Sequence, residues 1–231
     1  MQLLEHYIPM MLDSTINALI IVPEITKGMK SIGSKALLEI KKQKCVLDYQ
    51  IESIRSIDHN IKITVATGFE SEKISKILER YKNIDYVYNA KYQSTNQAES
   101  LRLYLENKPD VTNLLVISSG VIFKHKSILK SMLKGDSKIF VLNKQKENFT
   151  LGCADQAFLE YIFYDLPKPW SECLYLNRHI ITWLRTFILE NSIQQMYLFE
   201  IINEILNHSL SVTKQDIDKK DIMKITNQKD I

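Results

Sequence analysis

Short apolar runs alternate with helical stretches from residue 18 to about residue 141, and this alternation constrains the fold more than any other feature of the chain. Residues 18–22 are wholly apolar, as in a buried strand. Residues 46–57 carry apolar side chains on one helical face. Such alternation predicts βαβ units around a mainly parallel sheet, so we expect an α/β fold.

The same patterns predict the other elements. We expect strands at 61–66, 85–88 and 113–117, and helices at 72–81, 97–105 and 126–133. After residue 138 the alternation ends. There we expect strands at 138–142 and 150–157, a turn or loop with two prolines at 166–170, helices at 176–190 and 193–208, and closing strands within 209–217 and 222–225.

The chain has no internal repeat or low-complexity linker, so we expect one domain, residues 18–231, after an N-terminal extension, residues 1–17. A chain of 231 residues can bury a sufficient core without disulfides. Its cysteines, Cys45, Cys153 and Cys173, lack the paired spacing of a zinc site and are expected to be buried in a reducing compartment.

Charge and hydropathy limit the kinds of binding partner that we expect. The formal charge of +3 is spread along the chain and leaves no footprint for direct nucleic-acid binding. The apolar stretch 18–23 is far shorter than the ~20 residues of a membrane span, and residues 1–17 lack a basic leader. We therefore expect a cytoplasmic protein without membrane contact; a protein partner or a homo-oligomer remains an open alternative.

Ligands of open parallel sheets bind beyond the carboxyl ends of the strands. Residues 23–35 follow the first strand and contain Gly28, Lys30 and Lys35. Glycine lets backbone amides approach an anion, and lysine neutralises phosphate charge. The segment is neither a Walker loop nor a dinucleotide fingerprint, so a surface loop without a ligand is the alternative.

A second candidate segment, residues 89–96, is rich in asparagine and hydroxyl side chains and is followed by Ser100. Thr95 or Asn96 can cap the next helix by accepting its first free amides. Capping accounts for one of these residues and leaves the others for a ligand, although a cap plus a packed loop is the alternative.

Gly120 lies just past the apolar run 114–117, which is expected to be a strand. The position after such a strand is where α/β enzymes place metal-binding carboxylates. No Asp or Glu occurs between Asp110 and Asp136, so a shift of one residue supplies no carboxylate. Whether the protein is an enzyme depends largely on this position.

Several motifs follow one another in a fixed order: TKGMK at 26–30, SKALLEI at 34–40, LDYQIE at 47–52, TGF at 67–69 and NAKYQSTNQAESL at 89–101, with a late helix at 198–206 and the closing segment 225–231. Together they resemble the nucleotidyltransferase family with a GT-A-like fold, which includes sugar-1-phosphate nucleotidyltransferases and phosphocholine cytidylyltransferases. The segment 89–101 is similar to the choline-phosphate branch at every fixed position of Asn-x-x-Tyr-x-x-Thr-Asn-x-x-x-Ser-Leu.

The resemblance implies a single Rossmann-like (GT-A-like) domain with a mixed, mainly parallel central sheet. It implies attack of a phosphate oxygen on the α-phosphorus of a nucleoside triphosphate, with release of pyrophosphate. Carried onto this chain, Lys30 and Lys35 are the catalytic cations, with Lys30 replacing an arginine and losing its bidentate fork. The implied nucleotide-binding residues are Gly28, Thr67, Gly68, Asn89, Thr95, Asn96 and Ser100.

The chain departs from the family at the metal site. The two metal-binding aspartates of the family fall on Gly120 and Thr226, and the first loop glycine falls on Thr26. Neither Gly120 nor Thr226 offers the anionic oxygen that Mg²⁺ prefers. Asp221 and Asp230 lie nearby but out of register.

Three hypotheses follow. The favoured one is a catalytically impaired or inactive relative, a pseudoenzyme that binds a nucleotide or nucleotide-sugar and has a binding or assembly role. The alternative is an active, atypical nucleotidyltransferase that joins a nucleoside triphosphate to a phosphorylated sugar or alcohol, with Mg²⁺ as cofactor only in that case. A glycosyltransferase is the weakest, because its Asp-x-Asp pattern at 216–218 lies at the wrong end of the chain.

Overall fold

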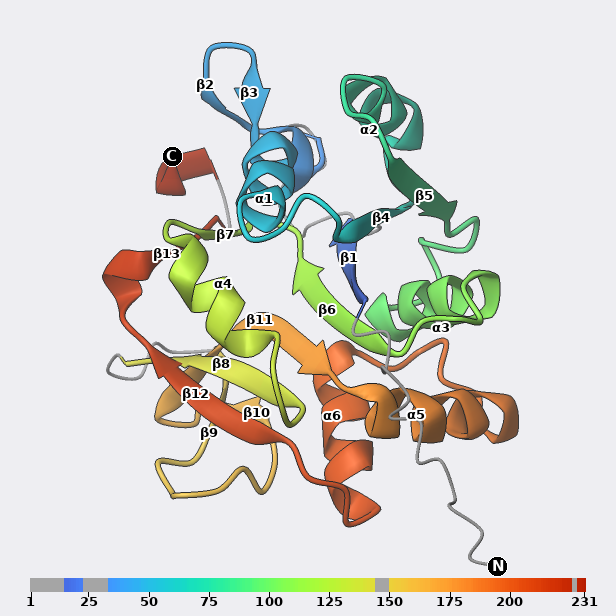
Figure 1. Cartoon of the computed structure of the whole chain (residues 1–231), viewed down its shortest axis with the longest axis vertical. Helices are drawn as coiled ribbons and strands as arrows, with labels where there is room; N and C mark the ends of the chain where they lie inside the picture. The colour runs from blue at the N-terminus through green and yellow to red at the C-terminus, as the bar shows by residue number, and fades with distance from the viewer. Residues whose placement is uncertain (1–14, 23–32, 144–149, 226–227) are drawn as a thin grey trace, which may run out of the picture.

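The computed structural model describes residues 15–22, 33–143, 150–225 and 228–231. In this part of the chain, a mixed nine-stranded sheet carries helices on both faces (Figure 1). The helices are α1 (Val46–Arg55), α2 (Ser71–Leu78), α3 (Gln97–Asn107), α4 (Lys126–Met132), α5 (Arg178–Glu190) and α6 (Leu198–Asn207). None of these helices combines the length and apolar character that crossing a membrane requires.

The sheet consists of β1 (Ile16–Val22), β4 (Lys62–Thr67), β5 (Ile84–Tyr88), β6 (Asn113–Ser118), β8 (Lys138–Leu142), β9 (Leu151–Cys153), β10 (Phe163–Tyr164), β11 (Lys168–Leu176) and β12 (Thr213–Ile217). Its order is β10-β9-β11-β6-β1-β4-β5, with β8 pairing with β11 and β12 pairing with β8. Strands β6, β1, β4 and β5 are parallel, and β11 runs antiparallel to β6. The predicted α/β fold with a mixed sheet is confirmed.

Helices cover both faces of the sheet, and this explains why its central strands are apolar throughout. In β1, Leu19 and Ile21 pack into the core beneath α3, α5 and α6. Ala18, Ile20 and Val22 alternate with them and pack into the core beneath α1, α2 and α4. Successive strand residues point to opposite faces, so a strand buried on both sides needs an unbroken apolar run.

Two small sheets flank the main one. They are β2 (Glu39–Lys41) with β3 (Lys44–Cys45), and β7 (Val121–Phe123) with β13 (Ile222–Lys224). Of their strands, only β13 was predicted, as a closing strand within 222–225. The predicted loop at 166–170 is wrong from Lys168 onward, because β11 begins there. Pro169 lies near the start of β11, opposite Gly152 of β9, where a missing amide hydrogen is tolerated. A Cβ on Gly152 would lie 2.5 Å from the carbonyl oxygen of Lys168.

The helix predicted at 193–208 begins only at Leu198. The backbone carbonyls of Gln194 and Met196, ahead of it, accept the amides of Asn96 and Ala98. This segment is therefore held in a non-helical conformation by the start of α3. All three cysteines are buried, as predicted.

The start of α1 is fixed by a buried carboxylate. Asp48 accepts hydrogen bonds from the Cys45 amide at 2.8 Å and from the Tyr81 hydroxyl at 2.6 Å. Arg80 adds a longer ion pair at 3.4 Å. Burial alone would raise the pKa of Asp48, but the hydrogen bonds from Tyr81 and Cys45 outweigh it, so this pKa lies below its ordinary value.

We expect Asp48→Asn to lower the free energy of unfolding by about 1–3 kcal/mol at neutral pH, because a buried acceptor of several hydrogen bonds is lost. The carboxylate contributes its full stability above the ordinary aspartate pKa of about 3.9, and this contribution disappears as the pH falls through the lower folded-state pKa. Urea unfolding at neutral and acid pH should show the deficit shrinking in acid. Glu52→Gln, on an exposed ion pair with Lys44, is the control and should cost less than about 1 kcal/mol. A deficit that stays constant down to acid pH would contradict this role of Asp48.

Candidate functional site

A cavity of about 210 Å³ lies at the carboxyl ends of β1 and β6. The chain passes from β1 to β4 and β5 on one side and then returns to β6 on the other, so the cavity occupies the topological switch point of the parallel strands. Its lining residues are Ile21, Val22, Ser34, Lys35, Gln97, Ser118, Ser119, Leu151, Tyr164, Trp170, Glu172 and Tyr197.

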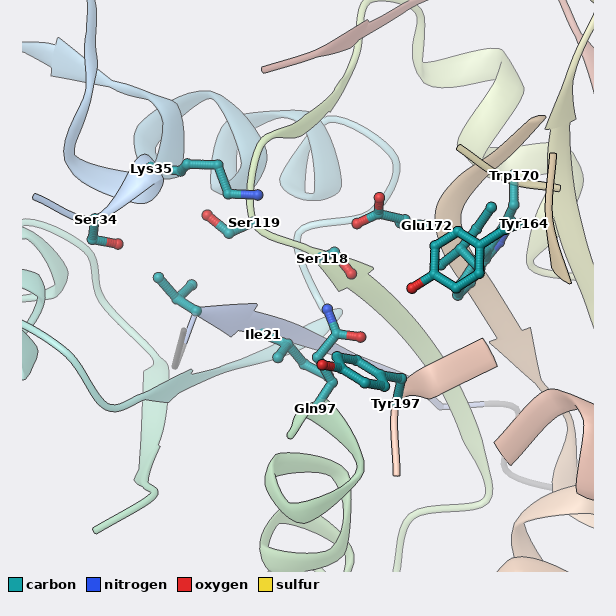
Figure 2. A pocket seen from close by; sticks show the side chains of 12 residues that line it. Ile21, Ser34, Lys35, Gln97, Ser118, Ser119, Tyr164, Trp170, Glu172 and Tyr197 are labelled. Atoms are coloured by element: carbon teal, nitrogen blue, oxygen red, sulfur yellow. The ribbon is translucent and has the colours of Figure 1, made fainter. Parts of the chain in front are cut away.

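Figure 2 shows Lys35 and Glu172 extending into the cavity from opposite sides, with Ser118 and Ser119 between them. The amide of Ser119 donates to the carbonyl of Ile21 at 3.0 Å, so these serines continue directly from the sheet. The hydroxyl oxygens of Ser118 and Ser119 are both buried and have no hydrogen-bond partner in the described part of the chain. Because buried hydroxyls are normally paired, these two are available to a ligand.

Lys35 begins a short 3-10 helix, η1 (Lys35–Leu37), whose entry is fixed by Glu70. The Glu70 carboxylate accepts the amide of Ser34 at 2.7 Å and also pairs with Lys73. Gly33 has φ +94°, and a Cβ there would lie 2.6 Å from the same carboxylate. A glycine is therefore required for Glu70 to reach the backbone ahead of Lys35.

Glu172 lies on a bulge of β11. Trp170 pairs with Val141 and Leu174 with Ile139, so β11 advances four residues while β8 advances two. Glu172 has φ +62°, a left-handed conformation that is strained for any residue other than glycine. The indole nitrogen of Trp170 donates to the carbonyl of Cys173 at 3.0 Å and thereby closes the bulge. The Glu172 carboxylate forms an ion pair with Lys224 at 2.6 Å.

Aromatic side chains form one wall of the cavity. Tyr164 and Tyr197 are partly exposed, and both contact Phe199, Tyr164 edge-on at 5.9 Å and Tyr197 stacked at 6.0 Å between ring centroids. Trp170 is buried beside them. Together with Glu172, this wall joins aromatic faces to a negative charge.

Gly120 has a backbone that excludes a side chain. Its φ is +93°, and a Cβ would lie 2.4 Å from the carbonyl oxygen of Ile225. The Ile225 amide donates to the Gly120 carbonyl at 2.8 Å, which ties the turn after β6 to the segment after β13. On the other side, the side-chain amide of Gln50 donates to the carbonyls of Ser118 and Val121, both at 2.9 Å. The glycine is thus a requirement of this tight turn.

Of the predicted site residues that the structure describes, Lys35 lines the cavity and the others do not. Asn89 donates to Thr95 at 3.0 Å and accepts the amide of Lys91, while Thr95 donates to the carbonyl of Lys91. These side chains are therefore used within their own loop. Gly28, Lys30 and Thr226 lie outside the described residues.

The predicted capping of α3 is wrong. Asn96 occupies the N-cap position, but its side chain forms no capping hydrogen bond. The side-chain amide of Asn96 donates instead to the backbone carbonyl of Gln195 at 2.5 Å. Thr67 is buried at the end of β4, where its carbonyl accepts the Asn89 amide, and Gly68 follows it in a bridge to Glu70. Ser100 is fully buried, and its hydroxyl has no partner within the described residues.

Sequence reasoning missed Glu172, Lys224 and the aromatic wall. Glu172 follows a segment that was expected to be a loop, and only the bulge in β11 turns it into the cavity. No local motif marks such a position, because the pairing of β11 with β8 and β6 is set by residues far apart in the sequence.

No protein-family model matches the chain, and no curated protein matches it. Solved structures do. A CTP:phosphocholine cytidylyltransferase from Streptococcus pneumoniae is 19% identical, with a TM-score of 0.74, over 94% of this chain and 96% of that one. An inositol-1-phosphate CTP transferase from T. maritima is 13% identical, with a TM-score of 0.74, over 94% and 92%. A nucleoside-diphosphate-sugar pyrophosphorylase from Vibrio cholerae RC9 is 13% identical, with a TM-score of 0.69, over 94% and 97%.

The fold is therefore that of the nucleotidyltransferases, as the sequence motifs predicted. The likeness extends over nearly the whole chain and includes both the parallel and the antiparallel parts of the sheet.

Proposed function

We propose that this protein binds a nucleotide or nucleotide-sugar in the cavity at the carboxyl ends of β1 and β6. The observation that carries the proposal is the combination of Lys35 with the buried hydroxyls of Ser118 and Ser119, which have no partner among the described residues, at the switch point of the sheet. An ammonium group and two hydroxyl donors suit phosphate oxygens. Two of the similar solved structures are of CTP-dependent transferases and a third is of a nucleoside-diphosphate-sugar pyrophosphorylase, which supports the same class of ligand.

We further propose that nucleotidyl transfer is impaired. Mg²⁺ prefers several hard, mostly anionic oxygen ligands. Gly120 supplies none, and its backbone leaves no room for a carboxylate. Glu172 is the one acidic residue among the described residues that line the cavity, and Lys224 already neutralises it. The described residues therefore do not fit a magnesium ion of the kind the fold family uses, and a binding or assembly role fits them better.

A second candidate is an active nucleotidyltransferase that joins a nucleoside triphosphate to a phosphorylated alcohol bearing an ammonium group. The aromatic wall favours it, because the faces of Tyr164, Trp170 and Tyr197 beside a carboxylate attract an alkylammonium group. Phosphocholine is the acceptor to test, because one of the similar structures is a CTP:phosphocholine cytidylyltransferase.

Calorimetric titration with each of the four nucleoside triphosphates tests the binding. We expect at least one to bind, and Lys35→Ala to weaken it by about tenfold or more, because a charge-assisted contact to phosphate is lost. Lys76→Ala, which removes an exposed lysine on α2, is the control and should leave the affinity unchanged. The absence of both heat and thermal stabilisation with every nucleotide would disprove the proposal.

A pyrophosphate-release assay with phosphocholine and sugar-1-phosphates distinguishes the two candidates. Turnover that disappears in Lys35→Ala would overturn the impaired function in favour of the active one. Binding without turnover is the expected result.

A further inference from the structure

Glu172 lines the cavity on the side opposite Lys35, and Lys224 forms an ion pair with it. Their charged atoms are 2.6 Å apart, and their side chains are only 26% and 24% exposed. Water screens such a partly buried pair less than it screens a pair at the surface. Lys35 and Glu172 line the cavity, and Lys224 adjoins it through the ion pair, so the three side chains together carry a net charge of one positive unit.

The backbone fixes the position of Lys224. In the β7–β13 pair, Lys224 lies opposite Val121. The next residue, Ile225, donates its amide to the Gly120 carbonyl. Lys224 is thus tied to the turn that follows β6, which is the turn where a carboxylate would be needed to hold a metal ion.

Glu172 reaches Lys224 from a strained position. Its left-handed φ and the bulge around it turn the carboxylate out of the sheet and toward the cavity. Residues held in such conformations concentrate at functional sites, where the surrounding structure maintains them. The hydroxyls of Ser118 and Ser119, which find no partner in the part of the chain that the structure describes, line the same cavity and independently indicate a polar ligand there.

We propose that Lys224, with Glu172 as its counter-ion, provides the positive charge that a divalent cation provides in related folds, so that phosphate groups bind here without a divalent cation. The proposal rests on the proposed nucleotide binding and assigns the groups responsible for it. A lysine ammonium is a compact point charge with three donors, which can be shared between a carboxylate and a phosphate oxygen. Glu172 keeps the ammonium in place before the phosphate binds and competes with the phosphate afterwards.

The affinity for tripolyphosphate, measured by calorimetry in EDTA and in excess Mg²⁺, tests this proposal. For the wild-type protein, we expect binding in EDTA to be at least as tight as in excess Mg²⁺, since no ion is required and Mg²⁺ neutralises part of the charge of tripolyphosphate. Lys224→Met should weaken binding by about tenfold or more in EDTA, and Glu172→Gln should strengthen it, because the competing carboxylate is gone. Lys220→Met is the matched control: Lys220 pairs with Asp218 at the exposed surface, and its loss should change the affinity little.

Lys224→Met also leaves Glu172 unpaired, so the double variant Lys224→Met/Glu172→Gln separates the lost ammonium from the freed carboxylate. It should still bind more weakly than the wild type. Wild-type binding that requires Mg²⁺, or a Glu172→Gln variant that binds no more tightly, would overturn the role of the pair while the nucleotide site stands. If neither tripolyphosphate nor any nucleoside triphosphate binds the wild type under either condition, the proposed function itself fails. If Lys224→Met does not fold, the affinity of Glu172→Gln and the comparison of EDTA with Mg²⁺ still test whether the pair binds phosphate without a divalent cation.

Discussion

Replacing Gly120 by aspartate is expected to cost about 3 kcal/mol or more of folding free energy and to create no metal site. Two effects add. A residue with a side chain is strained at φ +93°, and its Cβ would lie 2.4 Å from the carbonyl oxygen of Ile225. That carbonyl belongs to the backbone next to β13, so it cannot move without disturbing the Ile225–Gly120 hydrogen bond.

Gly135 provides a control that separates the two effects. It also has a positive φ, +75°, but a Cβ there would meet nothing within 4 Å. We expect Gly135→Ala to cost about 1 kcal/mol, from strain alone, and Gly120→Ala to cost clearly more. Urea unfolding of Gly120→Ala, Gly120→Asp and Gly135→Ala measures the difference. A Gly120→Asp variant that is as stable as the wild type and gains affinity for Mg²⁺ would show that the turn accepts a carboxylate.

Gly120 thus has two separate consequences, the absence of a carboxylate and the exclusion of any side chain, and the sequence predicts only the first. The absence of a carboxylate after β6 follows from the sequence, because no Asp or Glu lies between Asp110 and Asp136. The exclusion of a side chain depends on Ile225, which reaches the turn through the pairing of β13 with β7. That contact joins distant parts of the chain and leaves no local pattern.

The fold was largely predictable because its central strands are buried on both faces by helices. Such strands need continuous apolar runs, and their helices need apolar stripes, so β1, β4, β6 and the helices between them are visible in the sequence. Strand β11 was missed because Pro167 and Pro169 indicate a turn. In the structure, Pro169 is the second residue of β11 and lies opposite Gly152, so pairing with β9 outweighs the local preference of proline for a turn.

The candidate site was predicted only in part. Lys35 follows a strand and matches a motif, and it does line the cavity. The loop that begins at Asn89 also matches a motif, but its side chains hydrogen-bond within the loop or to Gln195. Glu172 and Lys224 were not predicted, because strand pairing alone brings them together.

Trp170→Ala is the second substitution with a large expected effect, a loss of about 3–5 kcal/mol of folding free energy. Trp170 is only 2% exposed and packs in the core between the sheet and helices α3, α5 and α6. Trp183, the other tryptophan, is only partly buried and stacks on Phe187, so Trp183→Ala should cost less. Urea unfolding of the two variants compares them directly, and equal losses would contradict the assignment of Trp170 to the core.

Trp170→Phe isolates the hydrogen bond that closes the bulge of β11. Phenylalanine retains most of the buried ring but cannot donate to the Cys173 carbonyl, so we expect a smaller loss of about 1–2 kcal/mol. Because that bond spans Glu172, the same variant should also change the affinity for tripolyphosphate, whereas Trp183→Ala should not. A Trp170→Phe variant with unchanged stability and affinity would mean that the indole does not hold the bulge. An altered affinity at nearly native stability would instead show that the packing of β11 influences the Glu172–Lys224 pair. Trp170 can affect the ligand in two ways, by orienting Glu172 and by lining the cavity itself.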